Sequence, residues 1–438
     1  MSRRPLVLLA LLLVVACTEE STTSTTVTAE TTTVGGQTTT SAGVATTTTT
    51  PAAVTTTAPD LSGLEGVSDE VRSQLEDLIR VAQEIRDLPF LTPPALTVVS
   101  GDELEARVRS DIEEQAEDFP ADEALYQMLG LLNEDADLES IVLELYGEQV
   151  AGFYDGETGE IVVPAREDGF SLLQQGTLVH ELVHALTDQH FGFYDPLQAM
   201  VDEERLDEAS SYQALIEGDA TFAEVQWVQS LSQREIGEFI AESLGIERSA
   251  LDSAPRFLRE SLLFPYDAGL AFAQSLYASG GWEPIDDAYS TMLELTASTE
   301  QVITPSDFTR DLPVEVPITE IPVPGYELER TSSWGEQGFR VMLNQGSLVA
   351  TMAGAADGWG GDTYHQWFDG ENAAIMLIYV GDTQRDLDEL EDALLTFAGE
   401  AFPEDHFAWV EELDGQLYFI AADDPLVGEG IRAAAGLD

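Results

Sequence analysis

Apolar residues recur every three or four positions along much of the chain, which is the spacing of one face of an α-helix. The spacing is regular between Val67 and Leu88, and prolines close that segment at Pro89, Pro93 and Pro94. Similar spacing predicts helices at Asp102–Phe119, Asp122–Leu132 and Asp137–Glu148. We therefore expect the first part of the folded chain to be helical.

The pattern changes twice between residues 150 and 190. Two short apolar runs, Val150–Tyr154 and Glu160–Pro164, flank a turn that contains two glycines, which predicts a β-hairpin. The segment Leu172–Gln189 follows, with Ser171 and Gln174 placed as in a capping box and with apolar residues at Leu178, Val179, Leu182, Val183 and Leu186. The sequence therefore predicts a buried helix directly after a hairpin.

Helical spacing continues over Leu206–Ser230 and through Ser232–Ala297. The last hundred residues differ, because short apolar runs there predict strands at Gly346–Met352, Ala373–Val380, Phe407–Glu412 and Leu417–Ala422, with a helix at Leu387–Phe397. We therefore expect an α+β fold class, in which a mostly helical core with a small hairpin precedes a C-terminal α+β lobe.

The first residues have the organisation of a secretion signal. Two arginines precede an apolar run from Leu6 to Ala16, which is too short to span a bilayer. Val14-Val15-Ala16-Cys17 resembles the lipobox of bacterial lipoproteins, in which the cysteine is lipidated. This resemblance implies an extracytoplasmic protein anchored to the bacterial cell membrane through Cys17. The alternative is ordinary signal cleavage near Ala16.

Four further regions follow the signal at residues 1–17. Residues 18–59 are rich in Thr and poor in large apolar residues, so we expect a disordered stalk. Residues 60–149 should form an N-terminal helical region, residues 150–330 the region that holds the candidate chemistry, and residues 331–438 the C-terminal lobe. Cys17 is the only cysteine, so no intramolecular disulfide can form.

The composition is strongly acidic. The chain has 82 Asp and Glu residues against 18 basic ones, all of them Arg, and a formal net charge of −64. Such a charge repels nucleic acid and anionic lipid, so we expect no nucleic-acid partner and membrane contact through the N-terminal lipid only.

The strongest chemical signal is His180-Glu181-Leu182-Val183-His184 within the expected buried helix. Histidines four residues apart lie on the same face of a helix, so both imidazoles can bind one metal ion. Glu181 can then act as a general base toward a water on that metal. Two imidazoles and one carboxylate suit zinc, because they leave a fourth position for water.

The third ligand is open among several residues. His190 has the spacing of the third histidine in H-E-x-x-H-x-x-G-x-x-H, but Thr187 replaces the glycine that would turn the chain. If the helix continues instead, His190 points away from the metal face. Glu217 lies on the next expected helix, followed by Gly218. The remaining candidates are acidic residues of the same stretch: Glu203, Glu208 and Glu224.

The hairpin, the H-E-L-V-H helix and the downstream Glu217-Gly218-Asp219-Ala220 together resemble the core of a gluzincin-type zinc metallopeptidase. The resemblance implies a zincin-like fold with one zinc ion held by His180, His184 and Glu217. Asp219 would orient a ligand imidazole. The gap between His184 and Glu217 is longer than in the aminopeptidase-like gluzincins.

The function expected from these residues is hydrolysis of peptide bonds in a peptide or protein substrate at the cell surface. Glu181 would act as general base, and the substrate would add to the strand edge at Gly152–Tyr154 or Ile161–Val163. Two alternatives remain: a non-catalytic surface lipoprotein that binds a partner, and either a zinc enzyme that acts on a non-peptide substrate or a structural zinc site.

The donor that would stabilise the oxyanion is not evident from the sequence, and the candidates are Tyr194, Tyr364 and His365. The last two end the segment Gly358–His365, which contains three glycines and is expected to be a loop. It would either fold over the cleft or form a Trp-anchored turn between strands.

Overall fold

The computed structural model describes residues 67–113, 119–149, 152–164, 169–246, 248–345, 352–403 and 405–437. The expected signal, Cys17 and the stalk lie outside these residues. The strand expected at Gly346–Met352 also lies outside them, except for Met352, which is in a turn.

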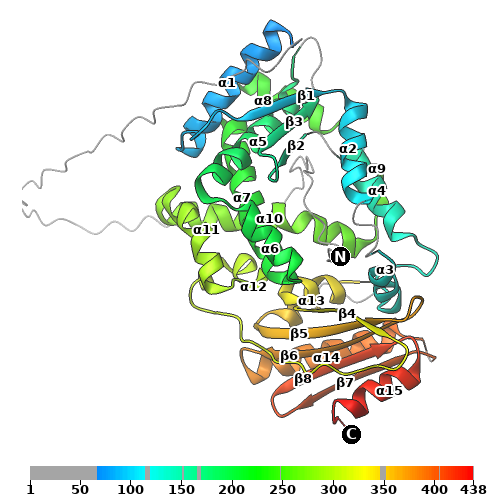
Figure 1. The fold of residues 1–438 in the computed structure, drawn as a ribbon. Coiled ribbons are helices and arrows are strands. Elements are labelled where there is room, and N and C mark those ends of the chain that lie inside the picture. Colours follow the sequence, from blue (N-terminus) through cyan, green and yellow to red (C-terminus); the bar gives the residue numbers. More distant parts are fainter. Residues whose placement is uncertain are drawn as a thin grey trace, which may run out of the picture.

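The fold class is α+β, as predicted, because the described residues are about 59% helical and include two small sheets. Helices fill the upper part of the molecule, and the larger sheet lies at the opposite end, near the C-terminus (Figure 1). None of the described helices combines the length and the apolar composition needed to cross a membrane.

The four helices predicted in this part are present, but the one expected to end at Phe119 is described only to Glu113, and Phe119 begins the next helix. Their bounds are α1 Asp69–Arg86, α2 Gly101–Glu113, α3 Phe119–Met128 and α4 Leu138–Gln149. The Ser68 side chain caps α1 by accepting a hydrogen bond from the Val71 N–H. The buried residues of α1 recur at the predicted spacing.

The predicted hairpin is confirmed as β2 (Phe153–Asp155) and β3 (Glu160–Pro164). A strand that the sequence did not reveal, β1 (Ala95–Val99), pairs with β3 in parallel and makes the order β1-β3-β2. Because β3 is paired on both sides, the expectation that Ile161–Val163 offers a free edge is wrong. A five-residue strand with one buried position gives little signal in a sequence.

The helix that contains the histidines is α5 (Leu172–Phe191). Its capping box is present, since the Ser171 side chain accepts from the Gln174 N–H and the Gln174 side chain accepts from the Ser171 N–H. The helix continues through His190 and ends at Gly192, whose φ of 61° is unstrained for glycine. The predicted burial of this helix is confirmed from Gly176 to Thr187.

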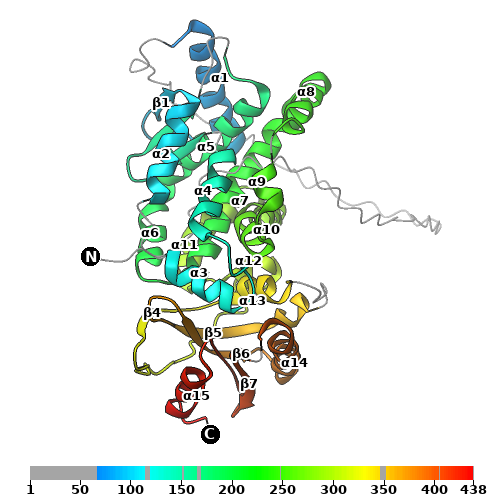
Figure 2. The same ribbon diagram turned by 90° about the vertical axis from the view of Figure 1, so that its right-hand side faces the viewer.

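The long helix expected at Leu206–Ser230 and the helices expected through Ser232–Ala297 are present, whereas α6, α12 and η1 were not predicted. The bounds of all these elements are α6 Tyr194–Asp202, α7 Leu206–Ser230, α8 Gln233–Ser243, α9 Ser249–Ser253, α10 Arg256–Gly280, α11 Glu283–Leu295, α12 Thr299–Ile303 and the short 3₁₀ helix η1 Pro305–Asp307. The helix α8 projects from the body (Figure 2).

The C-terminal lobe is a five-stranded antiparallel sheet of order β4-β5-β6-β8-β7. Three of the four predicted strands (β6, β7 and β8) and the predicted helix (α14) are present, and five further elements were not predicted. The bounds are β4 Glu327–Ser332, α13 Gly335–Leu343, η2 Ala353–Ala356, β5 Trp359–Phe368, β6 Ala373–Gly381, α14 Gln384–Ala401, β7 Phe407–Leu413, β8 Gln416–Ala422 and α15 Pro425–Ala434.

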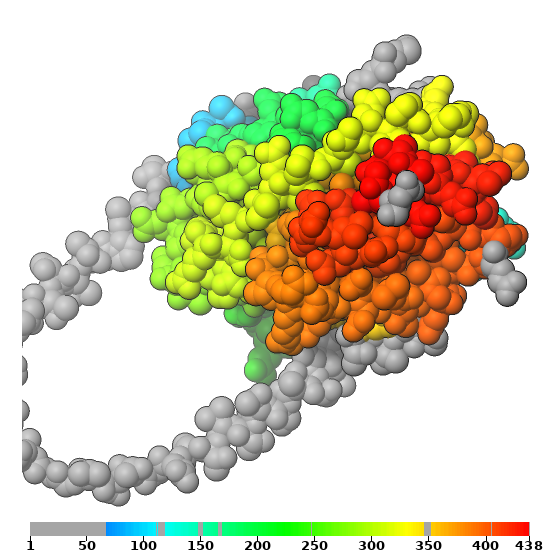
Figure 3. Space-filling view, turned by 90° about the horizontal axis from the view of Figure 1, so that it is seen from below, coloured from blue at the N-terminus to red at the C-terminus, as the bar shows by residue number. Residues whose placement is uncertain are grey.

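The segment Gly358–His365 is not a loop, so both interpretations of it as one are wrong. It forms most of β5, which is paired along its length with β6. Its glycines have a packing reason, because a Cβ on Gly361 would lie 2.3 Å from the Val314 carbonyl oxygen. Val314 belongs to a proline-rich segment, residues 312–326, that buries Val316, Ile321 and Val323 against the lobe. In the view from below, yellow atoms adjoin the orange and red atoms of this lobe (Figure 3).

Contacts cross the region boundaries expected from the sequence. The apolar face of α1 shares a core with α5, whereas α3 packs against β5 and β6 of the C-terminal sheet. The buried pair of Arg330 Nη1 and Asp122 Oδ1, 2.7 Å apart, joins β4 to α3. The helices of residues 60–149 therefore support two different parts of the molecule.

Candidate metal centre

Three side chains from two helices converge at the centre of the helical part. His180 and His184 come from α5, and Glu217 comes from α7, which packs beside α5. All three are at least 96% buried. Of the candidate third ligands, the structure brings only Glu217 into this group, which could hold a metal ion.

The distances from the Glu217 carboxylate to the two imidazoles are close to those between neighbouring ligands of a tetrahedral metal site. Glu217 Oε2 lies 3.1 Å from His180 Nε2 and 3.4 Å from His184 Nε2. In a tetrahedral zinc site with ligand distances near 2.0–2.1 Å, neighbouring donor atoms are about 3.3 Å apart. The Glu217 carboxylate is therefore placed to share one metal ion with each of the two imidazoles.

The electrostatics of the cluster also favour a cation. Burial works against ionisation of Glu217, but the two imidazoles outweigh it and lower the pKa of this carboxyl to about 2. Burial likewise opposes the charge on His180, and Glu217 and Glu224 overcome it and raise its pKa to about 10. A divalent cation would replace the proton that His180 holds, so binding of a metal ion releases a proton.

Glu181 lies in the same buried region with its carboxylate uncommitted. Its side chain is fully buried, and neither oxygen has a hydrogen-bond partner. Burial raises the pKa of Glu181 to about 8. The positive charge of His180 acts in the opposite direction, and so does the nearby backbone N–H of Tyr154, which is outside hydrogen-bond geometry. A carboxyl group with this pKa can both accept and release a proton near neutral pH.

Glu224 has a role that the sequence analysis missed. Its Oε2 lies 3.6 Å from His180 Nδ1, the ring nitrogen opposite the one that faces Glu217. Gly176 makes room for it, because a Cβ there would lie 2.9 Å from Glu224 Oε1. A carboxylate at this place fixes the orientation of a ligand imidazole. The available signal was its position seven residues after Glu217, which is two helical turns along the same face.

His190 and Asp219 lie outside the cluster. The His190 ring is 2.7 Å from the Pro89 carbonyl oxygen through Nε2, as expected for a helix that continues past Thr187. Asp219 was expected to orient a ligand imidazole, but its oxygens accept hydrogen bonds from Arg86 and Tyr289 instead. This expectation is wrong, because Asp219 is on the far side of α7 from Glu217.

Glu203 and Glu208 do not approach the histidines either, since both form ion pairs with Arg205 at the start of α7.

The expected oxyanion donors lie away from the histidines. Tyr364 and His365 are buried in β5 of the C-terminal sheet, where His365 Nδ1 contacts Thr331 Oγ1 at 2.7 Å. The ring of Tyr194 packs over Gly156 in the hairpin turn. Tyr266 of α10 is near the cluster instead, with its ring centroid 6.4 Å from that of His180. The sequence offered no sign of this contact, since it depends on how α10 crosses α7.

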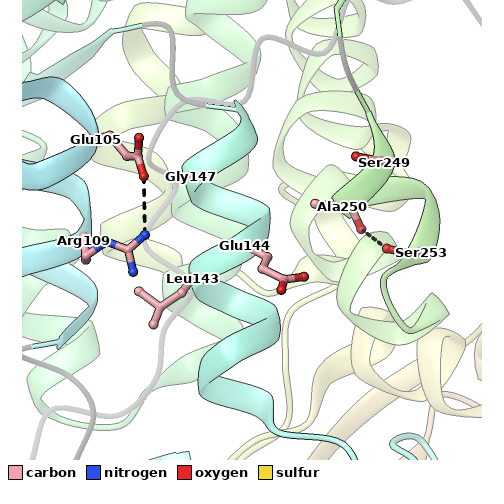
Figure 4. Close-up of a pocket in the computed structure, with 8 residues that line it drawn as sticks. All are labelled: Glu105, Arg109, Leu143, Glu144, Gly147, Ser249, Ala250 and Ser253. Atoms are coloured by element: carbon pink, nitrogen blue, oxygen red, sulfur yellow. Dashed lines mark hydrogen bonds and ion pairs between the residues drawn. The ribbon is translucent and has the colours of Figure 1, made fainter. Parts of the chain in front are cut away.

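Two other features lie apart from this cluster. A pocket of about 360 Å³ lies between α2, α4 and α9, with Glu105 and Arg109 on one wall and Ser249 and Ser253 on the other (Figure 4). The cluster residues do not line it. Separately, the carboxylates of Glu300, Asp311 and Asp382 have oxygens within 4.8 Å of one another. Neither feature combines metal ligands with a buried base.

Comparisons with protein-family models, with curated proteins and with solved structures found no match for this chain. Its function is therefore inferred from the geometry of the site.

Proposed function

We propose that this protein is a zinc-dependent peptidase with a zincin-like catalytic region. The observation that supports the proposal most directly is the buried convergence of His180, His184 and Glu217 beside the uncommitted carboxylate of Glu181. A structural metal site does not need a buried general base, and placing one without a partner costs free energy. The pairing of ligands and base therefore favours catalysis over a structural or purely binding role.

Each residue has a distinct part in the proposed reaction. His180, His184 and Glu217 hold the ion, and Glu224 fixes the ring of His180. When bound, zinc supplies a Lewis acid that polarises the scissile carbonyl and makes a water molecule more acidic. Glu181 accepts the proton of the attacking water on a carboxylate oxygen and delivers it to the leaving nitrogen. Tyr266, beside His180, is the candidate donor to the oxyanion.

A peptide substrate suits the strand next to Glu181. Among the described strands, β2 pairs only with β3, so its other edge can pair with an extended peptide. The Tyr154 N–H approaches the Glu181 carboxylate, so a peptide on that edge lies beside the general base. Main-chain pairing accepts many side chains, which is consistent with a protein substrate presented outside the cell to an enzyme anchored through Cys17.

The test separates metal binding from catalysis. In the full chain, Glu181→Gln should retain stoichiometric zinc and lose at least about 100-fold in cleavage of an unfolded, fluorescently labelled protein, since a general base contributes roughly 10²–10⁴-fold. Glu217→Ala should lose the zinc, whereas His190→Ala should keep both zinc and activity.

Other outcomes would identify the alternatives. Zinc without cleavage in the parent chain would indicate a binding lipoprotein, a structural zinc or a hydrolase of non-peptide substrates. Absence of zinc from the parent would refute the proposal.

A further inference from the structure

The side chain of Arg86 links three helices at a fully buried position. Arg86 ends α1, and its Nε donates to Asp219 Oδ1 of α7 at 2.8 Å. Its Nη2 donates to Asp286 Oδ1 of α11 at 2.5 Å, and the guanidinium lies over the ring of Trp282 at 4.4 Å. Arg86 and Asp219 are both 0% exposed, so no solvent can compensate either charge.

The ion pair of Arg86 and Asp219 supports the turn of α7 that carries the third ligand, Glu217. Asp219 follows Glu217 by two residues, so the two side chains point to nearly opposite sides of α7, roughly 200° apart. Glu217 faces the histidines, and Asp219 faces α1. Arg86 therefore holds the back of the same turn whose front supplies Oε2 of Glu217 to the metal centre.

A second set of contacts leads from the pair to α5. The Tyr289 hydroxyl donates to the other oxygen of Asp219 at 2.9 Å. The Tyr289 ring stacks on Phe191 at 4.5 Å and lies 6.3 Å from Phe193, whose own ring is 6.2 Å from that of His184. The network thus also packs behind the helix that holds the two histidines.

We propose that Arg86 is a positioning residue for the metal centre, acting through Asp219. This inference rests on the proposed function in one respect, that the cluster binds zinc. Without the guanidinium, the Asp219 carboxylate is left buried and uncompensated, which folded proteins relieve by local movement. The turn that must move contains Glu217, so its Oε2 no longer meets the two imidazoles. Zinc affinity then depends on the docking of α1, the first described element of the chain.

The experiment compares two buried Arg–Asp pairs in the full-length chain. Arg86→Gln breaks the pair behind the cluster, and Arg330→Gln breaks the pair between α3 and β4, away from it. For each variant we would measure the Tm of the metal-free protein, the Kd for Zn²⁺ by competition with a chromophoric chelator, and the visible absorption of the Co²⁺ form.

Both variants should lower the Tm, but only Arg86→Gln should raise the Kd, by about 10- to 100-fold, as loss of groups that support metal ligands does. The Co²⁺ absorption should change in Arg86→Gln alone. An unchanged Kd, or equal changes in both variants, would overturn this inference and leave the proposed function intact. A parent chain that binds no Zn²⁺ would refute both.

A second pair of variants tests the mechanism, and also serves if Arg86→Gln does not fold. Adding Asp219→Asn to Arg86→Gln removes the orphaned charge, so the Kd should return toward the parent value. Arg86→Lys keeps a positive charge near Asp219 and should retain most of the affinity. If neither variant binds Zn²⁺ more tightly than Arg86→Gln does, the role assigned to the Arg86–Asp219 pair is wrong.

Discussion

At the scale of single residues, the candidate centre is defined by what surrounds its ligands. His180 has a carboxylate near each ring nitrogen, Glu217 at Nε2 and Glu224 at Nδ1, so its orientation is set on both sides. His184 has only Glu217, and its Nδ1 is buried with no hydrogen-bond partner among the described residues. The ring of His180 is therefore the better fixed of the two.

Glu224→Ala should weaken zinc binding about 10- to 100-fold without abolishing it, because the side chain orients a ligand and is not one itself. Glu224→Gln, which keeps an acceptor oxygen, should fall between the parent and Glu224→Ala. Competition with a chelator gives both values. The control is Glu238→Ala, which removes an exposed ion pair with Arg234 on α8 and should leave the affinity unchanged. A similar loss in both alanine variants would argue against an orienting role.

At the scale of elements, the site depends on how closely α7 and α10 cross. A Cβ on Gly218 would lie 2.1 Å from the Gly269 carbonyl oxygen, and a Cβ on Gly269 would lie 2.1 Å from the Ala214 carbonyl oxygen. These glycines let the two backbones touch, directly beside Glu217. The crossing also brings Tyr266, one turn before Gly269, to His180. A glycine in mid-helix costs about 1 kcal/mol relative to alanine, and the close approach of α10 accounts for it at this position.

Gly218→Ala should therefore lower the free energy of unfolding by about 1–3 kcal/mol, because the clash outweighs the gain of about 1 kcal/mol in helix propensity. It should also weaken zinc binding, since Glu217 is the adjacent residue. Chemical denaturation of the metal-free protein and chelator competition measure the two effects.

The matched control is Gly237→Ala on α8, where nothing lies within 4 Å of the added Cβ. This variant should be neutral or slightly stabilising. Stabilisation by Gly218→Ala as well would show that the backbones can separate freely at the crossing.

At the scale of the whole molecule, the helical part and the C-terminal lobe meet at a group of carboxylates. Glu300 of α12 lies beside Asp382, which follows β6, and Asp311, which follows η1. Burial raises the pKa of Glu300 to about 9, and the neighbouring charges of Asp382 and Glu336 add to the shift. The folded chain therefore binds this proton more tightly than the unfolded chain, whose ordinary value is near 4.5.

The folded protein is stabilised relative to the unfolded chain by the proton on Glu300. This contribution is fully present below pH 4.5 and is lost as the pH rises through about 9. Glu300→Gln mimics the protonated form, so it should raise the Tm at pH 9 by at least about 2 °C and leave the Tm at pH 5 unchanged. Thermal unfolding followed by circular dichroism at the two pH values tests this. The exposed Glu411 provides a control, since Glu411→Gln should change neither Tm; equal shifts for Glu300→Gln at both pH values would contradict the assignment.

The features that depend on local spacing could be predicted from the amino-acid sequence alone. The two histidines and Glu181 share one helix, so their arrangement follows from helical geometry, and the capping box and buried length of α5 follow from residues within a few positions of each other. The α+β class and the hairpin before α5 were predictable for the same reason.

The contacts between residues far apart in the sequence could not be predicted and are seen in the folded structure alone. Several acidic residues stood at plausible distances along the chain, and the packing of α7 against α5 brings Glu217 to the ligands and Glu224 behind His180. The same holds for Arg86, which lies 133 residues before Asp219, and for Tyr266. It also holds for β5, whose glycines suggest a loop until the segment that crosses them is known. Such contacts depend on the relative placement of whole elements, which no local pattern of residues encodes.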